Sequence, residues 1–213
     1  MPSSRAAGAS QASEYRLRGG DVRRKGIADL LHAFALLRRE SADARESLPE
    51  PSLYLVGDGP DRAAMETLAS ELGVASYVHF TGYVDDARPY FASADVFALI
   101  SRQDSCPLVI AEAREAGCAI LATDVGGIPE MLDDGAAGVL VPAAGDTAQI
   151  AAKLRWLLLD SQARGRFAAR AQENLEQLSV ERVSGEYMAI YQHTLAECNS
   201  MQRRQLRLDA RRT

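Results

Sequence analysis

The chain has 213 residues, of which 47% are hydrophobic and 25% are charged, a balance typical of a folded soluble domain. The formal net charge of -5 is unevenly distributed, because residues 1–25 hold six Arg or Lys and residues 200–213 hold five, which leaves 13 basic and 26 acidic side chains between them. An acidic body argues against a nucleic-acid-binding protein, and the basic ends are interpreted as solvated tails.

The number of cysteines and the length of the apolar runs indicate the cellular compartment in which the protein resides. Cys106, Cys118 and Cys198 are odd in number and lack CxxC spacing, which argues against both a zinc site and a disulfide framework. No apolar run approaches the ~20 residues that span a bilayer, and residues 1–16 lack the hydrophobic core of a secretion signal. We therefore expect a cytoplasmic protein that makes no membrane contact through this chain alone.

The first residues of the chain give no periodic signal. Residues 1–14 are small and polar, so we expect residues 1–24 to form a largely disordered tail. From Ile27 the apolar residues follow the three-and-four spacing of a helix, which should end near residue 40. The apolar run 53–56, stopped by two glycines and a proline, predicts a buried strand that enters a tight loop.

Helices and apolar strands then alternate along the chain. Apolar strands separated by helices predict a doubly wound, Rossmann-like parallel α/β sheet that is covered on both faces. We expect this domain to span residues 25–180, followed by a helix over 181–199 and a basic tail over 200–213. The other expected strands are 77–80, 95–100, 119–123 and 138–141, and the other expected helices are 61–72, 86–92, 107–116, 128–132, 146–159, 161–178 and 180–198.

Ligands of such sheets bind outside the carboxyl ends of the strands, where helix N-termini favour anions. Four loops are expected at this edge: the segment ending in RRKG, the GDGP turn, the TGYVDD loop and the SRQDSCP loop. The last loop carries Asp104 and leads into a helix that carries Glu112, and Pro107 suits the first turn of that helix. The sequence therefore places both acids at the ligand edge.

Several of these segments together resemble one known family. In order they are KGIADLLHAF, LYLVGDGP, VHFTGYV and DSCPLVIAEAREAGCAILATDVGGIPEML. This ordered set is similar to the C-terminal sugar-nucleotide-binding domain of family 4 glycosyltransferases of the GT-B fold, from residue 25 to about residue 180. The spacing D-x7-E from Asp104 to Glu112 is similar to the family's E-x7-E signature.

The resemblance implies roles for the two acids. Glu112 would accept hydrogen bonds from the ribose hydroxyls, and a carboxylate within an apolar stretch needs such donors; the alternative is a solvent-facing position on an amphipathic helix. Asp104 would contact the donor sugar in place of the family's glutamate, which is longer by one bond of about 1.5 Å. The alternative for Asp104 is the N-cap of the following helix.

Lys25 is one of only two lysines in the chain, beside 22 arginines. The resemblance implies that Lys25, with Arg24 beside it, binds the leaving diphosphate, whose negative charge grows as the glycosidic bond breaks. The alternative is a solvated basic run. The family also has an arginine a few residues earlier, where this chain has Gly20.

Further donor contacts are implied by the same resemblance. They are Gly57 and Gly59 in a turn that passes close to the ligand, Gly82, Tyr83 and Val84 beside the nucleobase, and Cys106, Pro107 and Leu108 at a helix start. The GDGP segment is alternatively a plain tight turn. Gly126, Gly127 and Glu130 are expected to serve loop geometry, and the three histidines share no spacing that suggests a catalytic triad or a metal site.

The function implied is transfer of a hexose-type sugar from a nucleotide-diphospho-sugar, with retention and without a metal or other cofactor. The family also has an N-terminal acceptor domain, whereas only 24 residues precede Lys25. We therefore expect a donor-binding half that works with a partner domain or subunit, or that self-associates. The alternatives are a non-catalytic or truncated sugar-nucleotide-binding module and a GT-B sugar-nucleotide epimerase.

Overall fold

The computed structural model describes residues 8–12, 26–43, 50–142 and 145–209. Internal contacts divide the chain into two units, unit 1 over Met1–Glu173 and unit 2 over Asn174–Thr213. Unit 1 is an α/β domain, and the described part of unit 2 is helical. The second unit begins a few residues before the boundary expected at residue 180.

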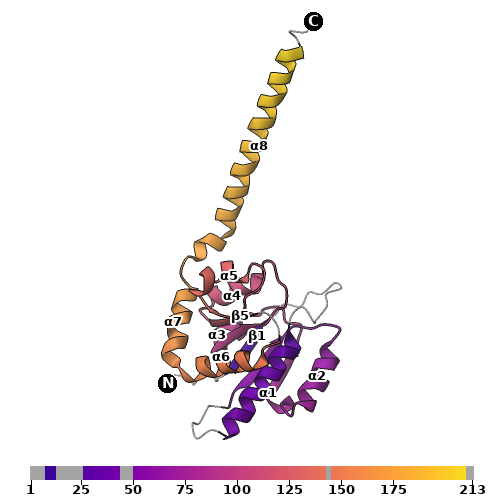
Figure 1. Ribbon diagram of the computed structural model, residues 1–213, viewed down its shortest axis with the longest axis vertical. Helices are drawn as coiled ribbons and strands as arrows, with labels where there is room; N and C mark the ends of the chain where they lie inside the picture. Colours follow the sequence, from indigo (N-terminus) through magenta and orange to yellow (C-terminus); the bar gives the residue numbers. More distant parts are fainter. Residues whose placement is uncertain (1–7, 13–25, 44–49, 143–144, 210–213) are drawn as a thin grey trace. The chain divides into compact units, whose positions relative to one another are not determined.

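Unit 1 is built on a six-stranded sheet in the order β3-β2-β1-β4-β5-β6, and all of its strand pairs are parallel. Figure 1 shows strands of this sheet among the helices that cover it. This order is that of a doubly wound Rossmann sheet, so the predicted fold class is confirmed. The strands are β1 (Gly8–Ala12), β2 (Ser52–Val56), β3 (Val78–Gly82), β4 (Val96–Leu99), β5 (Ala119–Thr123) and β6 (Val139–Val141).

Strand β1 corrects the expectation that residues 1–24 form a disordered tail. It pairs with β2 over its whole length and with β4 at Ala9 and Ser10, so it lies in the middle of the sheet. Its sequence GASQA contains no apolar run, and a strand between two others is held by backbone hydrogen bonds along both edges. Residues 1–7 and 13–24 of the expected tail lie outside the described residues.

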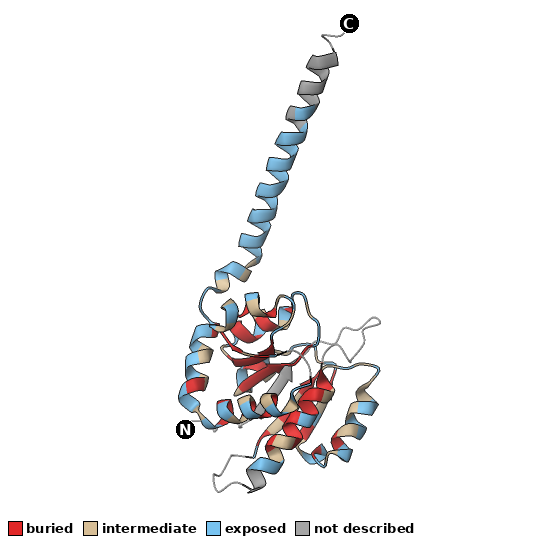
Figure 2. Cartoon of the chain, viewed as in Figure 1, coloured by how far each residue is buried: buried red, intermediate tan, exposed pale blue. Residues whose placement is uncertain are grey.

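Helices cover both faces of the sheet, and alternate strand residues serve the two faces. The buried residues gather on the strands and on the helix faces turned toward them (Figure 2). In β4, Val96 and Ala98 join one core cluster with residues of α1, α2 and α6, whereas Phe97 and Leu99 join a second cluster with residues of α3, α4 and α5. The helices are α1 (Ile27–Asp43), α2 (Arg62–Glu71), α3 (Arg88–Ser93), α4 (Leu108–Glu115), α5 (Ile128–Met131), α6 (Thr147–Leu159) and α7 (Ser161–Ala171).

The C-terminal helices differ from the predicted ones in two places. The helix expected over 161–178 is interrupted, because α7 ends at Ala171 and Asn174 adopts a left-handed conformation with φ 56° before the short 3-10 turn η4 (Leu175–Leu178). Helix α8 (Val180–Asp209) extends past the predicted end at residue 198. The prediction of a tail over residues 200–213 is therefore wrong for residues 200–209, which belong to α8. Residues 210–213 lie outside the described residues.

The described part of unit 2 contains η4 and the 30-residue helix α8. Its described part exposes a series of large apolar side chains: Val180, Val183, Tyr187, Met188, Ile190, Tyr191, Leu195 and Met201. Among the described residues, no helix combines the length and the apolar composition that a membrane span requires.

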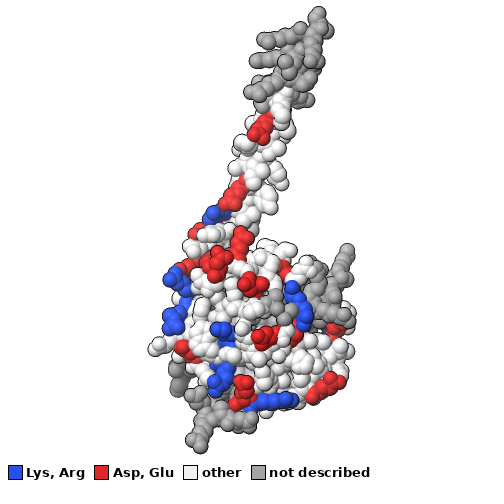
Figure 3. Space-filling model, in the orientation of Figure 1, with Lys and Arg blue, Asp and Glu red and all other residues white. Residues whose placement is uncertain are grey.

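On the face of unit 1 drawn in Figure 3, acidic and basic side chains are interspersed and form no single basic patch.

The start of α1 depends on a close backbone contact at Gly26. Gly26 has a φ of +61°, and a Cβ atom there would overlap the carbonyl oxygen of Ile100. Gly73 has a similar φ of +73° but open space around the position of a Cβ. The two glycines therefore separate the cost of backbone conformation from the cost of a steric clash.

We predict that Gly26→Ala lowers the free energy of unfolding by about 1–3 kcal/mol more than Gly73→Ala, because only the former forces backbone segments apart. Each should also lose about 1–2 kcal/mol for a left-handed Cβ-bearing residue. Urea titration followed by circular dichroism measures both. Equal losses in the two variants would show that the contact with Ile100 relaxes at no cost.

Candidate functional site

The parallel strands bring the predicted loops to one edge of the sheet. Gly57 follows β2, Tyr83 follows β3 and Ser101 lies just beyond β4, so these three loops share the edge as expected. The fourth loop ends at Gly26, whose contact with Ile100 places the start of α1 beside the end of β4. Arg24 and Lys25 lie outside the described residues.

A pocket of about 630 Å³ opens between these loops and α4. Its wall combines residues from the end of β2, the loop after β3, helix α3 and one face of α4. Four residues predicted from the sequence line it together: Gly57, Tyr83, Val84 and Glu112. The other lining residues are Val56, Asp85, Asp86, Ala87, Arg88, Phe91, Ala92, Glu115 and Ala116.

Two glycines join the loops that form one wall of the pocket. The Gly57 N–H donates a 3.0 Å hydrogen bond to the carbonyl oxygen of Gly82, which links the ends of β2 and β3. Both glycines have positive φ angles, +122° for Gly57 and +71° for Gly82, which residues with a side chain rarely adopt. Gly59 lies in a smaller hollow next to this wall, together with Ile27 and Arg62. The GDGP segment is thus a turn whose first glycine also lines the pocket.

Glu112 lies on the exposed face of α4 and lines the pocket. The apolar residues beside Glu112 in the sequence do not enclose its carboxylate, because Ala113 and Arg114 are the residues of this turn that face the interior. The exposed position agrees with the alternative of a solvent-facing glutamate and equally with a ligand-binding carboxylate. The pocket in front of Glu112 distinguishes it from an ordinary surface residue.

Asp104 is half-buried in the loop between β4 and α4. The alternative that Asp104 is the N-cap of α4 is wrong, because the N-cap is Pro107. The backbone of the loop is held from the other side, since the Gly127 N–H donates to the carbonyl oxygen of Asp104 at 3.2 Å. A Cβ at Gly126 or Gly127 would overlap the carbonyl oxygens of Asp104 and Ser105, which confirms that these glycines serve loop geometry.

An ion pair that the sequence did not reveal fixes the same loop to α1. Asp29 is buried in the first turn of α1, and the guanidinium of Arg102 donates to both of its carboxylate oxygens at 2.8–3.1 Å. The two residues are 73 positions apart, so no local spacing signals the pair. A bidentate pair of this kind fixes orientation as well as distance.

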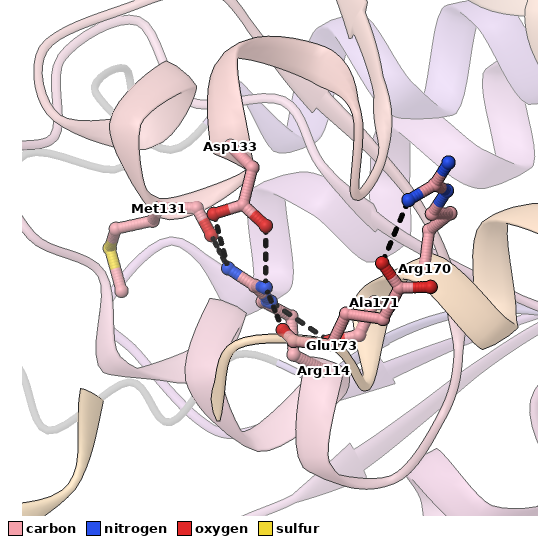
Figure 4. A network of polar contacts seen from close by, with 6 residues as sticks. All are labelled: Arg114, Met131, Asp133, Arg170, Ala171 and Glu173. Carbon is pink, nitrogen blue, oxygen red and sulfur yellow. Dashed lines mark hydrogen bonds and ion pairs between the residues drawn. The ribbon is translucent and has the colours of Figure 1, made fainter. Parts of the chain in front are cut away.

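Arg114 anchors α4 from its buried side, and its side chain is only 2% exposed (Figure 4). Its guanidinium donates to the carbonyl oxygens of Met131, Ala171 and Glu173 at 2.6–2.9 Å and to the carboxylate of Asp133 at 2.9 Å. One side chain thus connects α4 with the region after α5 and with the end of α7. This network holds the helix that presents Glu112.

The loop after β3 contributes charged residues that sequence reasoning did not assign. The Arg88 guanidinium donates to both carboxylate oxygens of Asp86 at 2.8 and 2.9 Å. This contact lowers the pKa of Asp86 below its ordinary value, with help from the Arg88 backbone N–H. Asp85 and Glu115 also line the pocket. Glu115 follows Glu112 by one helical turn, and that spacing was the signal available in the sequence.

The remaining predicted residues lie at the start of α4. Cys106 and Leu108 are exposed on either side of the N-cap Pro107. They do not line the 630 Å³ pocket, but they border the N-terminal end of the helix that does. Among the described residues, no three His, Cys, Asp or Glu side chains lie close enough to hold one metal ion.

Comparison with known proteins identifies similar sequences. Residues 17–160 match the family model described as "Glycosyl transferases group 1". The chain is 33% identical over 173 residues to the lipopolysaccharide core biosynthesis glycosyltransferase LpsE of Rhizobium meliloti (strain 1021), and the match covers 81% of this chain and 47% of LpsE. The chain spans about half the length of the curated relatives it matches.

Solved structures share the fold. WaaG, a glycosyltransferase involved in lipopolysaccharide biosynthesis, has a TM-score of 0.67 at 26% identity, over 81% of this chain and 43% of WaaG. Anabaena HepE, solved in complex with UDP, has a TM-score of 0.70 at 21% identity, over 87% of this chain and 49% of HepE. Each match covers about half of a longer structure.

We predict that Arg114→Met lowers the free energy of unfolding by about 3–5 kcal/mol, because it leaves buried carbonyls and the Asp133 carboxylate without their donor. Arg170→Met is the control. Arg170 pairs with Glu173 on the surface, at 62% and 52% exposure, and its loss should cost less than about 1 kcal/mol. Denaturant titration measures both, and similar losses would contradict an anchoring role for Arg114.

Proposed function

Because the chain belongs to the group 1 glycosyltransferase family and has the fold of a C-terminal GT-B domain, we propose that it is the donor-binding half of a glycosyltransferase. The donor is a nucleotide-diphospho-sugar. The observation that carries this proposal is the pocket at the ligand edge of the sheet, where Gly57, Tyr83, Val84 and Glu112 meet. These residues come from three separate segments of the sequence.

The proposed pose places the nucleoside in the pocket. The Glu112 carboxylate accepts hydrogen bonds from the ribose hydroxyls, since one carboxylate has two oxygens to receive two donors. The base lies against the wall formed by Gly57, Tyr83 and Val84. Gly57 has no side chain to occupy this space, and Tyr83 is 61% exposed and therefore accessible to a ligand.

The diphosphate lies toward the starts of α1 and α4 in this pose. Helix N-termini offer unpaired backbone N–H groups and a favourable dipole for anions. The N-cap of α4 is Pro107, whose side chain makes no capping hydrogen bond, so the first amides of the helix can meet a ligand near Cys106 and Leu108. Lys25 and Arg24, which precede α1, add positive charge for the leaving diphosphate.

The proposed reaction moves a hexose-type sugar to an acceptor. An acceptor nucleophile bonds to the anomeric carbon as the bond from that carbon to the diphosphate oxygen breaks, and the nucleoside diphosphate leaves. Asp104 holds hydroxyls of the sugar, in a loop fixed by the Asp29–Arg102 pair and by Gly126 and Gly127. Retention of configuration and independence of metal ions and other cofactors belong to the proposal through the family resemblance.

The acceptor site belongs to a partner in this proposal. The chain covers 47% of LpsE, which supports a donor half that works with a further domain, another subunit or a second copy. The apolar side chains along α8, such as Tyr187 and Tyr191, offer a surface for such contact. Positioning both reactants contributes up to ~7–11 kcal/mol to catalysis, so donor binding alone gives little transfer.

Isothermal titration calorimetry of the purified chain with nucleoside diphosphates, nucleotide sugars and nucleosides tests the proposal. At least one nucleoside diphosphate should bind, and its nucleoside should bind more weakly because it lacks the charged diphosphate. Absence of binding for every nucleotide at millimolar concentration would refute the proposed function.

We predict that Glu112→Gln weakens binding of the nucleoside diphosphate by about 1.5–3 kcal/mol, the usual contribution of hydrogen bonds to a charged group. Glu71→Gln, on α2 and outside the pocket, is the control and should bind normally. The 2′-deoxynucleotide should show a smaller loss with Glu112→Gln than the ribonucleotide does. Unchanged affinity in a folded Glu112→Gln protein would reject the ribose assignment.

We predict that Lys25→Ala weakens binding of the nucleoside diphosphate at least about tenfold, the value of about 1.4 kcal/mol at one charged contact, and leaves nucleoside binding unchanged. The other lysine, Lys153 on α6, packs near the ring of Trp156 and serves as the control. Lys153→Ala should bind both ligands normally. Equal losses for nucleoside and diphosphate in Lys25→Ala would indicate a folding defect instead.

A further inference from the structure

The pocket has a charge pattern that the general donor-binding proposal leaves unexplained. Of its charged lining residues, four are acidic and one is basic: Asp85, Asp86, Glu112, Glu115 and Arg88. A nucleotide diphosphate is an anion, so its phosphates should lie far from this acidic wall. The groups that meet the wall are then the uncharged ribose, at Glu112, and the uncharged base, so the rest of the wall must suit the hydrogen-bonding edge of that base.

Helix α4 sets the order of the groups along the pocket. Glu115 lies at its C-terminal end, Glu112 about 4.5 Å before it along the axis and Leu108 about 6 Å further toward the N-terminus, from a rise of 1.5 Å per residue. With phosphates at the helix N-terminus and ribose at Glu112, the base falls toward Glu115 and the loop after β3. That loop contributes Asp85 and Asp86 to the wall, and the first residue of α3, Arg88, adjoins them.

Most charged groups at this end already have a contact. Both carboxylate oxygens of Asp86 accept hydrogen bonds from Arg88, whose side chain is 87% exposed and therefore extends mainly into solvent. Glu115 interacts electrostatically with Arg88, and Glu112 is assigned to the ribose. Asp85 forms no hydrogen bond or ion pair through its carboxylate with any residue that the structure describes. No described residue therefore occupies its two oxygens, which line the pocket where a ligand would lie.

The four common bases differ in what they offer to a carboxylate. Guanine presents N1–H and the N2 amino group side by side, two donors that match the two oxygens of one carboxylate. Uracil presents a single N–H between two carbonyl oxygens, which a carboxylate repels. In adenine and in cytosine, the amino group adjoins a ring nitrogen that is an acceptor. Bidentate binding to a carboxylate therefore distinguishes guanine from the other three.

We propose that the pocket selects a guanine nucleotide and that Asp85 determines this specificity by accepting hydrogen bonds from guanine N1–H and N2–H. The donor is accordingly a guanosine-diphospho-sugar. This inference rests on the proposed function, because it names the base of the nucleotide that Glu112 holds. Backbone groups of Tyr83 and Val84 offer donors and acceptors to any base, so they contribute to affinity without discriminating.

Calorimetric titration of the full 213-residue chain with GDP, UDP, ADP, CDP and IDP tests the inference. GDP should bind at least about tenfold more tightly than UDP, ADP or CDP, as expected for a charge-assisted bidentate contact. IDP keeps N1–H but lacks the N2 amino group, so its affinity should lie between those of GDP and UDP. Equal affinity for GDP and UDP, or tighter binding of UDP, would overturn the inference while leaving nucleotide binding established.

The matched variants are Asp85→Asn and Glu71→Gln, each compared with the unaltered chain by thermal melting to confirm folding. Asp85→Asn should reduce GDP affinity about tenfold and leave UDP affinity unchanged or increased, because the amide offers only one acceptor oxygen. Glu71→Gln, outside the pocket, should leave the preference intact. An unchanged preference in Asp85→Asn would remove Asp85 from the site, and binding of no nucleotide would refute the proposed function and this inference with it.

Discussion

Backbone-to-backbone contact around the loop that follows β4 is the constraint on which the candidate site depends. Gly26 packs on the carbonyl oxygen of Ile100, and Gly126 and Gly127 pack on those of Asp104 and Ser105. None of these contacts leaves room for a Cβ atom. They fix the path of the loop from both sides, so the start of α1, Asp104 and the start of α4 meet at one edge of the sheet.

The same loop and helix are held by charged groups with very different surroundings. The Asp29–Arg102 pair ties the loop to α1 with a nearly buried acid and a half-exposed base. Arg114 instead lies inside unit 1 and binds three carbonyl oxygens as well as Asp133. A buried guanidinium is costly to desolvate. Its hydrogen bonds are directional, however, so they specify one arrangement of α4 more narrowly than apolar packing alone would.

The sequence predicted most of the fold because its strands are apolar and its helices are periodic. The runs 53–56, 95–100 and 119–123 all became buried strands. Strand β1 was not predicted, because GASQA has no apolar run and the strand depends on its neighbours for pairing. The interruption between α7 and η4 was not predicted, because it depends on one left-handed residue, Asn174, whose neighbours are good helix formers.

The candidate site was predictable only in part. The ordered motifs indicated Gly57, Tyr83, Val84 and Glu112, which do line one pocket. The exposure of Glu112 was not predictable, because an apolar neighbourhood in the sequence does not fix which side of a helix a residue occupies. Contacts between distant positions, such as Asp29 with Arg102, leave no local signal. Asp85 and Arg88 were not predicted as site residues, because charged residues that follow a strand are usually only solvated.

The position of β1 has a consequence for how unit 1 must be produced and handled. A polypeptide that began at Gly26 would keep the helices that the structure describes and five of the six described strands, yet β2 and β4 would each lose a neighbour in the middle of the sheet. Two inner rows of backbone N–H and C=O groups would then face an open slot. Such unpaired strand edges recruit strands from other molecules, so removal of the unremarkable residues before α1 favours edge-to-edge aggregation.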